Sequence, residues 1–225
     1  MSQAWFVTGT DTGVGKTFAS VALLHALRAR RLRAVGMKPV ASGCEHGVDG
    51  WQNEDAIALR AASDPVPDYA DVNPFALPVA TAPQLAARDA GIVVALPPLL
   101  EAFARLSASA DAVVVEGAGG WLAPMGDGLE QSAMARAVGG QVLLVVGLRL
   151  GCLSHARLTA RAIEADGCRM VGWIGNRIDP AFDRVDDYLG LLREALPAPC
   201  LGVLGHGMDA GAAAAALMLP ETASV

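Results

Sequence analysis

The chain has 225 residues, of which 53% are hydrophobic and 18% charged, and its formal net charge is −6. This composition excludes a disordered chain and provides apolar side chains for a sizeable core, so we expect a single domain over residues 1–225. The net negative charge argues against general nucleic-acid binding and favours small molecules and metal-bound phosphates as partners. The longest apolar stretch, residues 142–148, is too short to span a bilayer, and the N-terminus lacks a signal-peptide pattern. We therefore expect a cytoplasmic protein that does not associate with membranes.

The first predicted strand, residues 4–8, leads into the sequence GTDTGVGKT at residues 9–17, and a helix is predicted from Gly15 to about Arg30. A strand, a glycine-rich turn, Gly-Lys-Thr and a helix together are typical of a phosphate-binding P-loop. The backbone N–H groups of such a loop and the positive end of the helix face a polyphosphate. Lys16 is then placed to reach the β- and γ-phosphates, and the Thr17 hydroxyl to ligate Mg²⁺.

The spacing of this motif departs slightly from the standard one. Thr10 stands where a glycine is usual, and Gly9 lies one residue earlier. The alternative interpretation is a glycine-rich turn with an incidental lysine. The joint match of strand, loop, Lys-Thr and helix favours a nucleotide-binding site.

A second predicted strand, residues 33–37, ends at Lys38, and the sequence that follows it, residues 38–43, predicts a loop. A solvated surface charge is the alternative for Lys38, but a second cation beside Lys16 would stabilise charge on a transferring phosphoryl group. A helix is predicted over residues 53–62 with Asn53 as its N-cap. It carries Asp55, which is either a metal ligand or an acid that simply favours the helix start. A proline-rich connector over residues 65–83 and helices over residues 83–90 and 97–107 follow.

The next predicted strand, residues 111–116, ends in Glu116 and is followed by Gly-Ala-Gly-Gly at residues 117–120. Glu116 stands where a Walker-B acid would hold Mg²⁺, with a capping carboxylate as the alternative. Further on we expect helices over residues 131–138, 153–165 and 184–196 and strands over residues 141–146, 169–175 and 199–204. From Ala210 an alanine-rich tail either forms a helix or frays. The start of the 153–165 helix suits a carboxylate, although an ordinary capped helix is the alternative.

Apolar strands that alternate with helices predict an α/β fold, a doubly wound and mostly parallel sheet with helices on both faces, of P-loop NTPase type. Ligands in such sheets bind beyond the carboxyl ends of the strands. We therefore expect the strand ends at Gly9, Lys38, Glu116, Gly147 and Asn176 to converge.

Seven segments between residues 6 and 176 carry a more specific signal. They are FVTGTDTGVGKT (6–17), KPVASG (38–43), NEDA (53–56), VNP (72–74), VEGAGGW (115–121), GLRLGC (147–152) and GWIGN (172–176). Together, in this order, they resemble the dethiobiotin synthase family, ATP-dependent ligases that close the ureido ring in biotin synthesis. The P-loop alone fits many ATPases, whereas KPVASG together with VEGAGGW is far more specific.

The resemblance implies an enzyme that joins 7,8-diaminononanoate and CO₂ with ATP and Mg²⁺, through a carbamate and a carbamic–phosphoric anhydride. It implies that Lys38 and Lys16 neutralise the carbamate and the γ-phosphate, and that Thr12 and Ser42 contact the carbamate region. Mg²⁺ would bind to Thr17, Asp55 and Glu116. The nucleotide would contact Gly13, Val14, Gly15, Lys16, Thr17, Phe18, Gly117, Ala118, Gly119, Asn176 and Arg177. Gly119 would also line the substrate pocket, and the distal carboxylate would meet Gly151, Cys152, Leu153 and Ser154 of a second subunit, which makes the enzyme a homodimer.

Two alternatives stay open at this point. Residues 176–179, Asn-Arg-Ile-Asp, resemble the guanine motif Asn-Lys-x-Asp, so the choice between ATP and GTP is less secure than phosphate binding. A partitioning or septum-positioning switch ATPase on the same fold is the alternative function. Such proteins typically carry a lysine five residues before the P-loop lysine, and this chain has Asp11 there.

Overall fold

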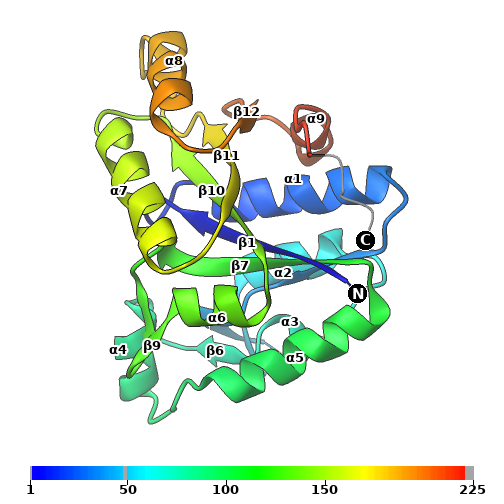
Figure 1. Cartoon of the computed structure of the whole chain (residues 1–225). Coiled ribbons are helices and arrows are strands. Elements are labelled where there is room, and N and C mark those ends of the chain that lie inside the picture. Colours follow the sequence, from blue (N-terminus) through cyan, green and yellow to red (C-terminus); the bar gives the residue numbers. More distant parts are fainter. Residues whose placement is uncertain (1, 48–49, 221–225) are drawn as a thin grey trace.

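The computed structural model describes residues 2–47 and 50–220, and its centre is a parallel sheet of six strands (Figure 1). The strands lie in the order β12-β11-β10-β1-β7-β2, and every neighbouring pair is parallel. Their bounds are β1 Gln3–Gly9, β2 Ala34–Met37, β7 Ala112–Gly120, β10 Gln141–Gly147, β11 Met170–Asn176 and β12 Cys200–Leu204. This arrangement confirms the predicted doubly wound α/β fold.

Helices cover both faces of the sheet, as predicted. On one face lie α1 (Lys16–Ala29), α2 (Glu54–Ala62) and α9 (Ala210–Ala215), and on the other α5 (Leu96–Ser109), α6 (Gln131–Ala137), α7 (Cys152–Ala165) and α8 (Val185–Ala195) (Figure 1). Strand residues alternate between the faces, so Trp5 packs on the α1 side while Phe6 packs on the α5 side. Both are buried, which is why these strands read as continuous apolar runs. No helix in the described part of the chain is both long and apolar enough to cross a membrane.

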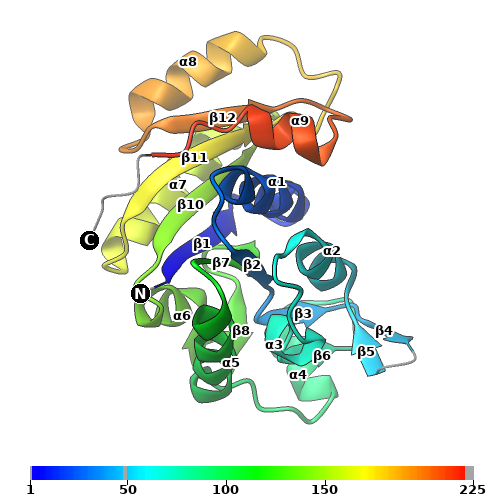
Figure 2. The same cartoon turned by 90° about the vertical axis from the view of Figure 1, so that its right-hand side faces the viewer.

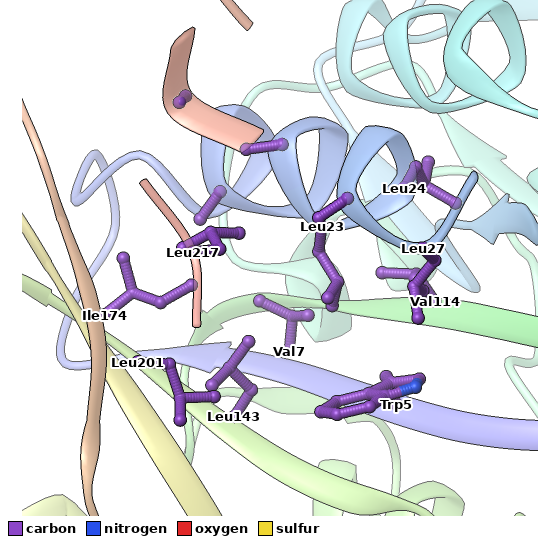
Figure 3. Packing of buried hydrophobic residues seen from close by; sticks show 14 of the residues in the cluster. Trp5, Val7, Leu23, Leu24, Leu27, Val114, Leu143, Ile174, Leu201 and Leu217 are labelled. Carbon is purple, nitrogen blue, oxygen red and sulfur yellow. The ribbon is translucent and has the colours of Figure 1, made fainter. Parts of the chain in front are cut away.

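The core between α1 and the sheet fixes the helix that follows the P-loop (Figure 3). Leu23 and Leu27 of α1 project one helical turn apart toward Val7 and Val114 of the strands. Leu217, just after α9, joins the same cluster, so the alanine-rich tail from Ala210 forms a helix that packs on α1. The last part of that tail, residues 221–225, lies outside the described residues.

The predicted loop over residues 38–43 and the predicted connector over residues 65–83 contain more regular structure than expected. Within them, β3 (Val40–Ser42) pairs in parallel with β6 (Phe75–Leu77), α3 covers Tyr69–Val72, and α4 (Pro83–Asp89) follows. Figure 2 shows these elements gathered beyond β2, together with the hairpin of β4 (Glu45–Gly47) and β5 (Gly50–Gln52). Strands of three residues are too short to show an alternating pattern, and their partners are distant in sequence.

Strand β7 is longer than predicted, because it continues past Glu116 to Gly120. Val7 of β1 pairs with Glu116 and Gly9 pairs with Gly120, so β7 fits two extra residues into the same length of its neighbour. This irregularity bends the end of β7 at the edge of the sheet where β1 and β2 also end. A second hairpin, β8 (Pro124–Gly126) and β9 (Leu129–Glu130), follows the bend.

Candidate active site

The loop after β1 has the geometry of an anion-binding turn. Helix α1 starts at Lys16, and its N-cap Gly15 has a φ of 82°, a left-handed conformation that favours glycine. A side chain at this position would also run into the amide of Asn176. No side chain of a described residue caps α1, so the N–H groups of its first turn remain available to a bound anion.

Four side chains from four separate segments meet beside this loop. The Lys38 ammonium lies 2.6 Å from Oε1 of Glu116 and 2.8 Å from Oδ2 of Asp55. The Thr17 hydroxyl oxygen lies 2.6 Å from Asp55 Oδ1 and 2.9 Å from Glu116 Oε1. The Thr17 hydroxyl is therefore within hydrogen-bond distance of both carboxylates that are predicted to hold Mg²⁺ with it.

The oxygen atoms of this cluster fit a small divalent cation. Glu116 is fully buried, and its Oε2 has no hydrogen-bond partner among the described residues. Carboxylate and hydroxyl oxygens are the ligands that Mg²⁺ takes in proteins, usually with substrate phosphates completing its coordination. Within residues 2–47 and 50–220, no three His, Cys, Asp or Glu side chains come together as a metal site. A cation here would thus rely on Thr17 and on phosphate oxygens as well.

The charges in the cluster shift one another's protonation. Burial alone would lower the pKa of Lys38, but Glu116 and Asp55 outweigh it and hold that pKa above its ordinary value. Burial alone would raise the pKa of Asp55, but Lys38 and the hydrogen bond from Thr17 hold it below its usual range. Lys16 differs, because burial and the nearby Lys38 lower its pKa to about 8. Lys38 is thus fully compensated within the chain, whereas Lys16 is a cation in need of an anionic partner.

A cavity of about 880 Å³ opens in front of these groups. Eleven of the predicted site residues line it: Thr12, Gly13, Gly15, Lys16, Thr17, Lys38, Ser42, Asp55, Glu116, Ala118 and Gly119. Its size suits a ligand as large as a nucleotide with a small second substrate. The segments expected to converge at the strand ends of β1, β2 and β7 therefore do so.

The remaining residues predicted to contact the nucleotide do not line the cavity. Gly117 presents its carbonyl oxygen to Lys38 Nζ at 3.5 Å. Asn176 is buried and donates its Nδ2–H to the carbonyl oxygen of Val14 over 2.9 Å, which ties β11 to the P-loop. Phe18 is half-buried on α1, and Arg177 is exposed just after β11.

The predicted carboxylate segment, Gly151 to Ser154, forms the start of α7 and does not line this cavity. Gly151 is the N-cap with a φ of 93°, and no side chain of the described residues caps the helix. The segment is connected to the P-loop by its neighbour Arg149, whose guanidinium lies 2.5 Å from Asp11 Oδ2.

The sequence prediction missed several residues of the cavity wall. Asp11 and Asn53 line the cavity and belong to motifs that were recognised in the sequence. Their positions close to Thr12 and Asp55 could therefore have indicated that they belong to the site. Residues 80–83, which line the wall formed before α4, had no such signal, because they lie in a proline-rich connector. Gln131, the first residue of α6, is fully buried and donates to the carbonyl oxygens of Ala118 and Gly120, so it holds the bent end of β7.

Comparison with known proteins decides between the functions that this geometry allows. A family profile described as "AAA domain" matches residues 3–211. The ATP-dependent dethiobiotin synthetase of Xanthomonas euvesicatoria pv. vesicatoria is 59% identical over 97% of this chain and 98% of its own length. That of Xylella fastidiosa is 59% identical over 91% of this chain and 90% of its own length. The chain belongs to the dethiobiotin synthetase family.

Solved structures resemble the chain in fold alone. The cell division protein FtsY of Thermotoga maritima has a TM-score of 0.57 and 17% identity, and the match covers 94% of this chain and 64% of FtsY, just under two thirds. The septum site-determining protein MinD of Pyrococcus horikoshii, solved with Mg-ADP, has a TM-score of 0.53 and 15% identity over 96% of this chain and 93% of MinD. These neighbours confirm the P-loop NTPase-like fold. Membership of the dethiobiotin synthetase family makes the chain an enzyme of the ATP-dependent ligase class.

Proposed function

We propose that this enzyme converts 7,8-diaminononanoate and CO₂ to dethiobiotin with ATP, and that the reaction passes through a carbamate and a carbamic–phosphoric anhydride. The observation that carries the proposal is the presence of Lys16, Lys38 and the Thr17–Asp55–Glu116 oxygen cluster around one cavity. The named activity of relatives at 59% identity supports the same reaction.

In the proposed mechanism the P-loop binds the triphosphate, with Lys16 neutralising the β- and γ-phosphates. Thr17, Asp55 and Glu116 hold Mg²⁺, which when bound draws charge from the phosphate oxygens. The lowered pKa of Lys16 fits this role, because an incoming phosphate supplies the anion that the free site lacks.

The ring-closing chemistry needs charge neutralisation and alignment and does not need a protein nucleophile. One substrate amine adds to CO₂ and loses a proton, giving a carbamate that Lys38, Thr12 and Ser42 orient beside the γ-phosphate. A carbamate oxygen displaces ADP from the γ-phosphorus. The second amine then attacks the carbonyl carbon of the anhydride, and inorganic phosphate leaves as the ureido ring closes.

The distal carboxylate of the substrate is proposed to bind to the start of α7 in a second subunit, through N–H groups of Gly151 to Ser154. The absence of a side-chain cap among the described residues and the left-handed Gly151 support an anion site there. The enzyme would then act as a homodimer, and its four free thiols fit a cytoplasmic location.

Asn176 is proposed to select adenine. Its Nδ2 is occupied by the Val14 carbonyl, which leaves Oδ1 to accept a hydrogen bond from the exocyclic amino group of that base. A guanine would present a carbonyl oxygen at the same place.

The test is phosphate release with ATP, Mg²⁺ and bicarbonate, with and without the diamine, and repeated with GTP. We expect diamine-dependent release, dethiobiotin detected by mass spectrometry, and faster turnover with ATP than with GTP. Lys16→Ala should lower turnover at least ~100-fold, because it removes γ-phosphate stabilisation. Hydrolysis that ignores the diamine would overturn the proposal and favour a switch ATPase.

A further inference from the structure

A hydrogen-bond network lies beside the cavity, and its centre is the hydroxyl of the half-buried Tyr69 at the start of α3. The Tyr69 oxygen accepts a hydrogen bond from the backbone N–H of Asn53 over 2.8 Å and donates one to Asn73 Oδ1 over 3.2 Å. Asn53 and Asn73 are only 7% and 3% exposed. Burial raises the pKa of the Tyr69 hydroxyl, so it stays protonated and able to donate.

Each asparagine connects the network to a different part of the charge cluster. Asn53 is the N-cap of α2, and its Oδ1 accepts from the backbone N–H of Asp55 over 3.0 Å. Its Nδ2 lies 3.4 Å from the carbonyl oxygen of Ser42. Asn73 donates through Nδ2 to the carbonyl oxygen of Lys38 over 2.7 Å. One hydroxyl thus joins the backbone that carries Asp55 to the backbone that carries Lys38.

We propose that Tyr69 is a positioning residue, which fixes the segments of Lys38 and Asp55 relative to each other so that their side chains meet at 2.8 Å. Tyr69 does not line the cavity and acts through the two asparagines. The expected effect of Tyr69 on kcat rests on the proposed function. Its expected effect on Mg²⁺ binding can be measured without turnover and does not depend on that function.

The decisive variant is Tyr69→Phe, which keeps the ring and removes only the hydroxyl. The Asn53 N–H and Asn73 Oδ1 then lose their shared partner in a buried place. Substitutions behind ligating side chains typically weaken metal affinity or activity by about 10- to 100-fold. We expect kcat to fall roughly tenfold and the Mg²⁺ concentration for half-saturation to rise roughly tenfold. Calorimetry of ADP binding at increasing Mg²⁺ should show the same rise without any turnover.

Ser63→Ala is the matched control, because the Ser63 hydroxyl also connects two elements, α2 and β2. Its Oγ accepts from the N–H of Gly36 over 2.9 Å and donates to the carbonyl oxygen of Leu59 over 2.7 Å, at the opposite end of α2 from Asp55. This variant should lose stability and keep the kcat and Mg²⁺ dependence of the wild type.

A further variant, Asn73→Ala, separates the two branches of the network and also serves if Tyr69→Phe does not fold. It removes the bond to the Lys38 carbonyl and leaves Asn53 and Tyr69 in contact, so kcat should fall while Mg²⁺ dependence stays unchanged. The inference is overturned if Tyr69→Phe retains wild-type Mg²⁺ dependence and kcat, or if Ser63→Ala shifts both as Tyr69→Phe does. A wild-type enzyme that makes no dethiobiotin would refute the proposed function alone, since the calorimetric comparison would still test Tyr69.

Discussion

Replacement of Lys38 by methionine tests whether the buried charge cluster stabilises the fold as well as serving the reaction. Lys38 and Glu116 are 5% and 0% exposed, and their charged atoms lie 2.6 Å apart. Removal of one partner of a buried ion pair typically costs about 3–5 kcal/mol, because the other charge stays buried without compensation. The Asp55 side chain is 32% exposed, so water compensates part of its lost partner. We therefore expect a loss near the lower end of this range, about 3 kcal/mol.

The double variant Lys38→Met/Glu116→Gln separates this charge effect from a general packing defect. The neutral amide no longer needs a cation, so the double variant should be more stable than the sum of the single losses predicts, by roughly 1–2 kcal/mol. The assay is urea unfolding at pH 7 without nucleotide, followed by tryptophan fluorescence. A Lys38→Met protein within about 0.5 kcal/mol of wild type, or strictly additive losses, would refute the reasoning.

The pH dependence of stability gives an independent check on the same variant. In the wild type, the raised pKa of Lys38 contributes stability at every pH below about 10.5, and the lowered pKa of Asp55 contributes stability above about 3.8. Between pH 5 and 8 both contributions are constant. Without the ammonium, Asp55 keeps the burial that raises its pKa and loses the cation that lowers it. Asp55 then binds a proton more readily in the folded state, so Lys38→Met should gain stability as the pH falls from 7 to 5, whereas wild type should not.

Three further predictions concern the nucleotide loop, the end of β7 and the oligomeric state. The pKa of Lys16 is about 8, so nucleotide affinity measured by calorimetry should weaken by up to about tenfold from pH 8 to 9. Lys16→Arg should remove this pH dependence, because its guanidinium stays charged. A wild-type affinity that does not change between pH 8 and 9 would contradict the prediction. Gly117→Ala should lower kcat by at least about tenfold, because the new Cβ would collide with Gln131 Oε1 and displace the amide that holds β7. Gln131→Ala removes the same amide and should also lower kcat, and wild-type kcat in both variants would contradict this reasoning. Light scattering should give a mass of about 46 kDa, twice 23.1 kDa, and an active monomer would refute the proposed carboxylate site across two subunits.

The site residues that could be predicted from sequence are those that lie in or directly after a single recognisable strand or motif. Lys38 and Glu116 each follow a buried apolar run, and the carboxyl ends of parallel strands meet at one edge of a sheet. The P-loop is local in the chain, so its pattern predicted a helix from Gly15, and α1 begins at Lys16 with Gly15 as its N-cap. Asn53 was predicted as an N-cap, and its hydrogen bond to the Asp55 N–H confirms this.

The parts that could not be predicted depend on contacts between distant segments. Strands β3 and β6 have three residues each and pair across more than thirty positions, so neither has a pattern of its own. The extra residues in β7 show only against the register of β1. The role of Tyr69 depends on two asparagines from different elements, and a single tyrosine in a proline-rich connector indicates neither partner.

Local structural rules are broken where the proposed chemistry takes place. Helix α1 starts from a left-handed glycine without a side-chain cap among the described residues, and β7 bends directly after its only acidic residue, Glu116. Each feature would weaken an ordinary helix or strand. Here the uncapped start of α1 leaves N–H groups available for phosphate. The bend in β7 directly follows Glu116, whose carboxylate contacts Lys38 and Thr17. Such exceptions persist where the surrounding core is rigid enough to hold them, and the buried packing of α1 on β1 and β7 provides that support. Substitutions in this core should therefore impair nucleotide binding before they unfold the chain, because the packing of α1 helps to keep the P-loop in shape.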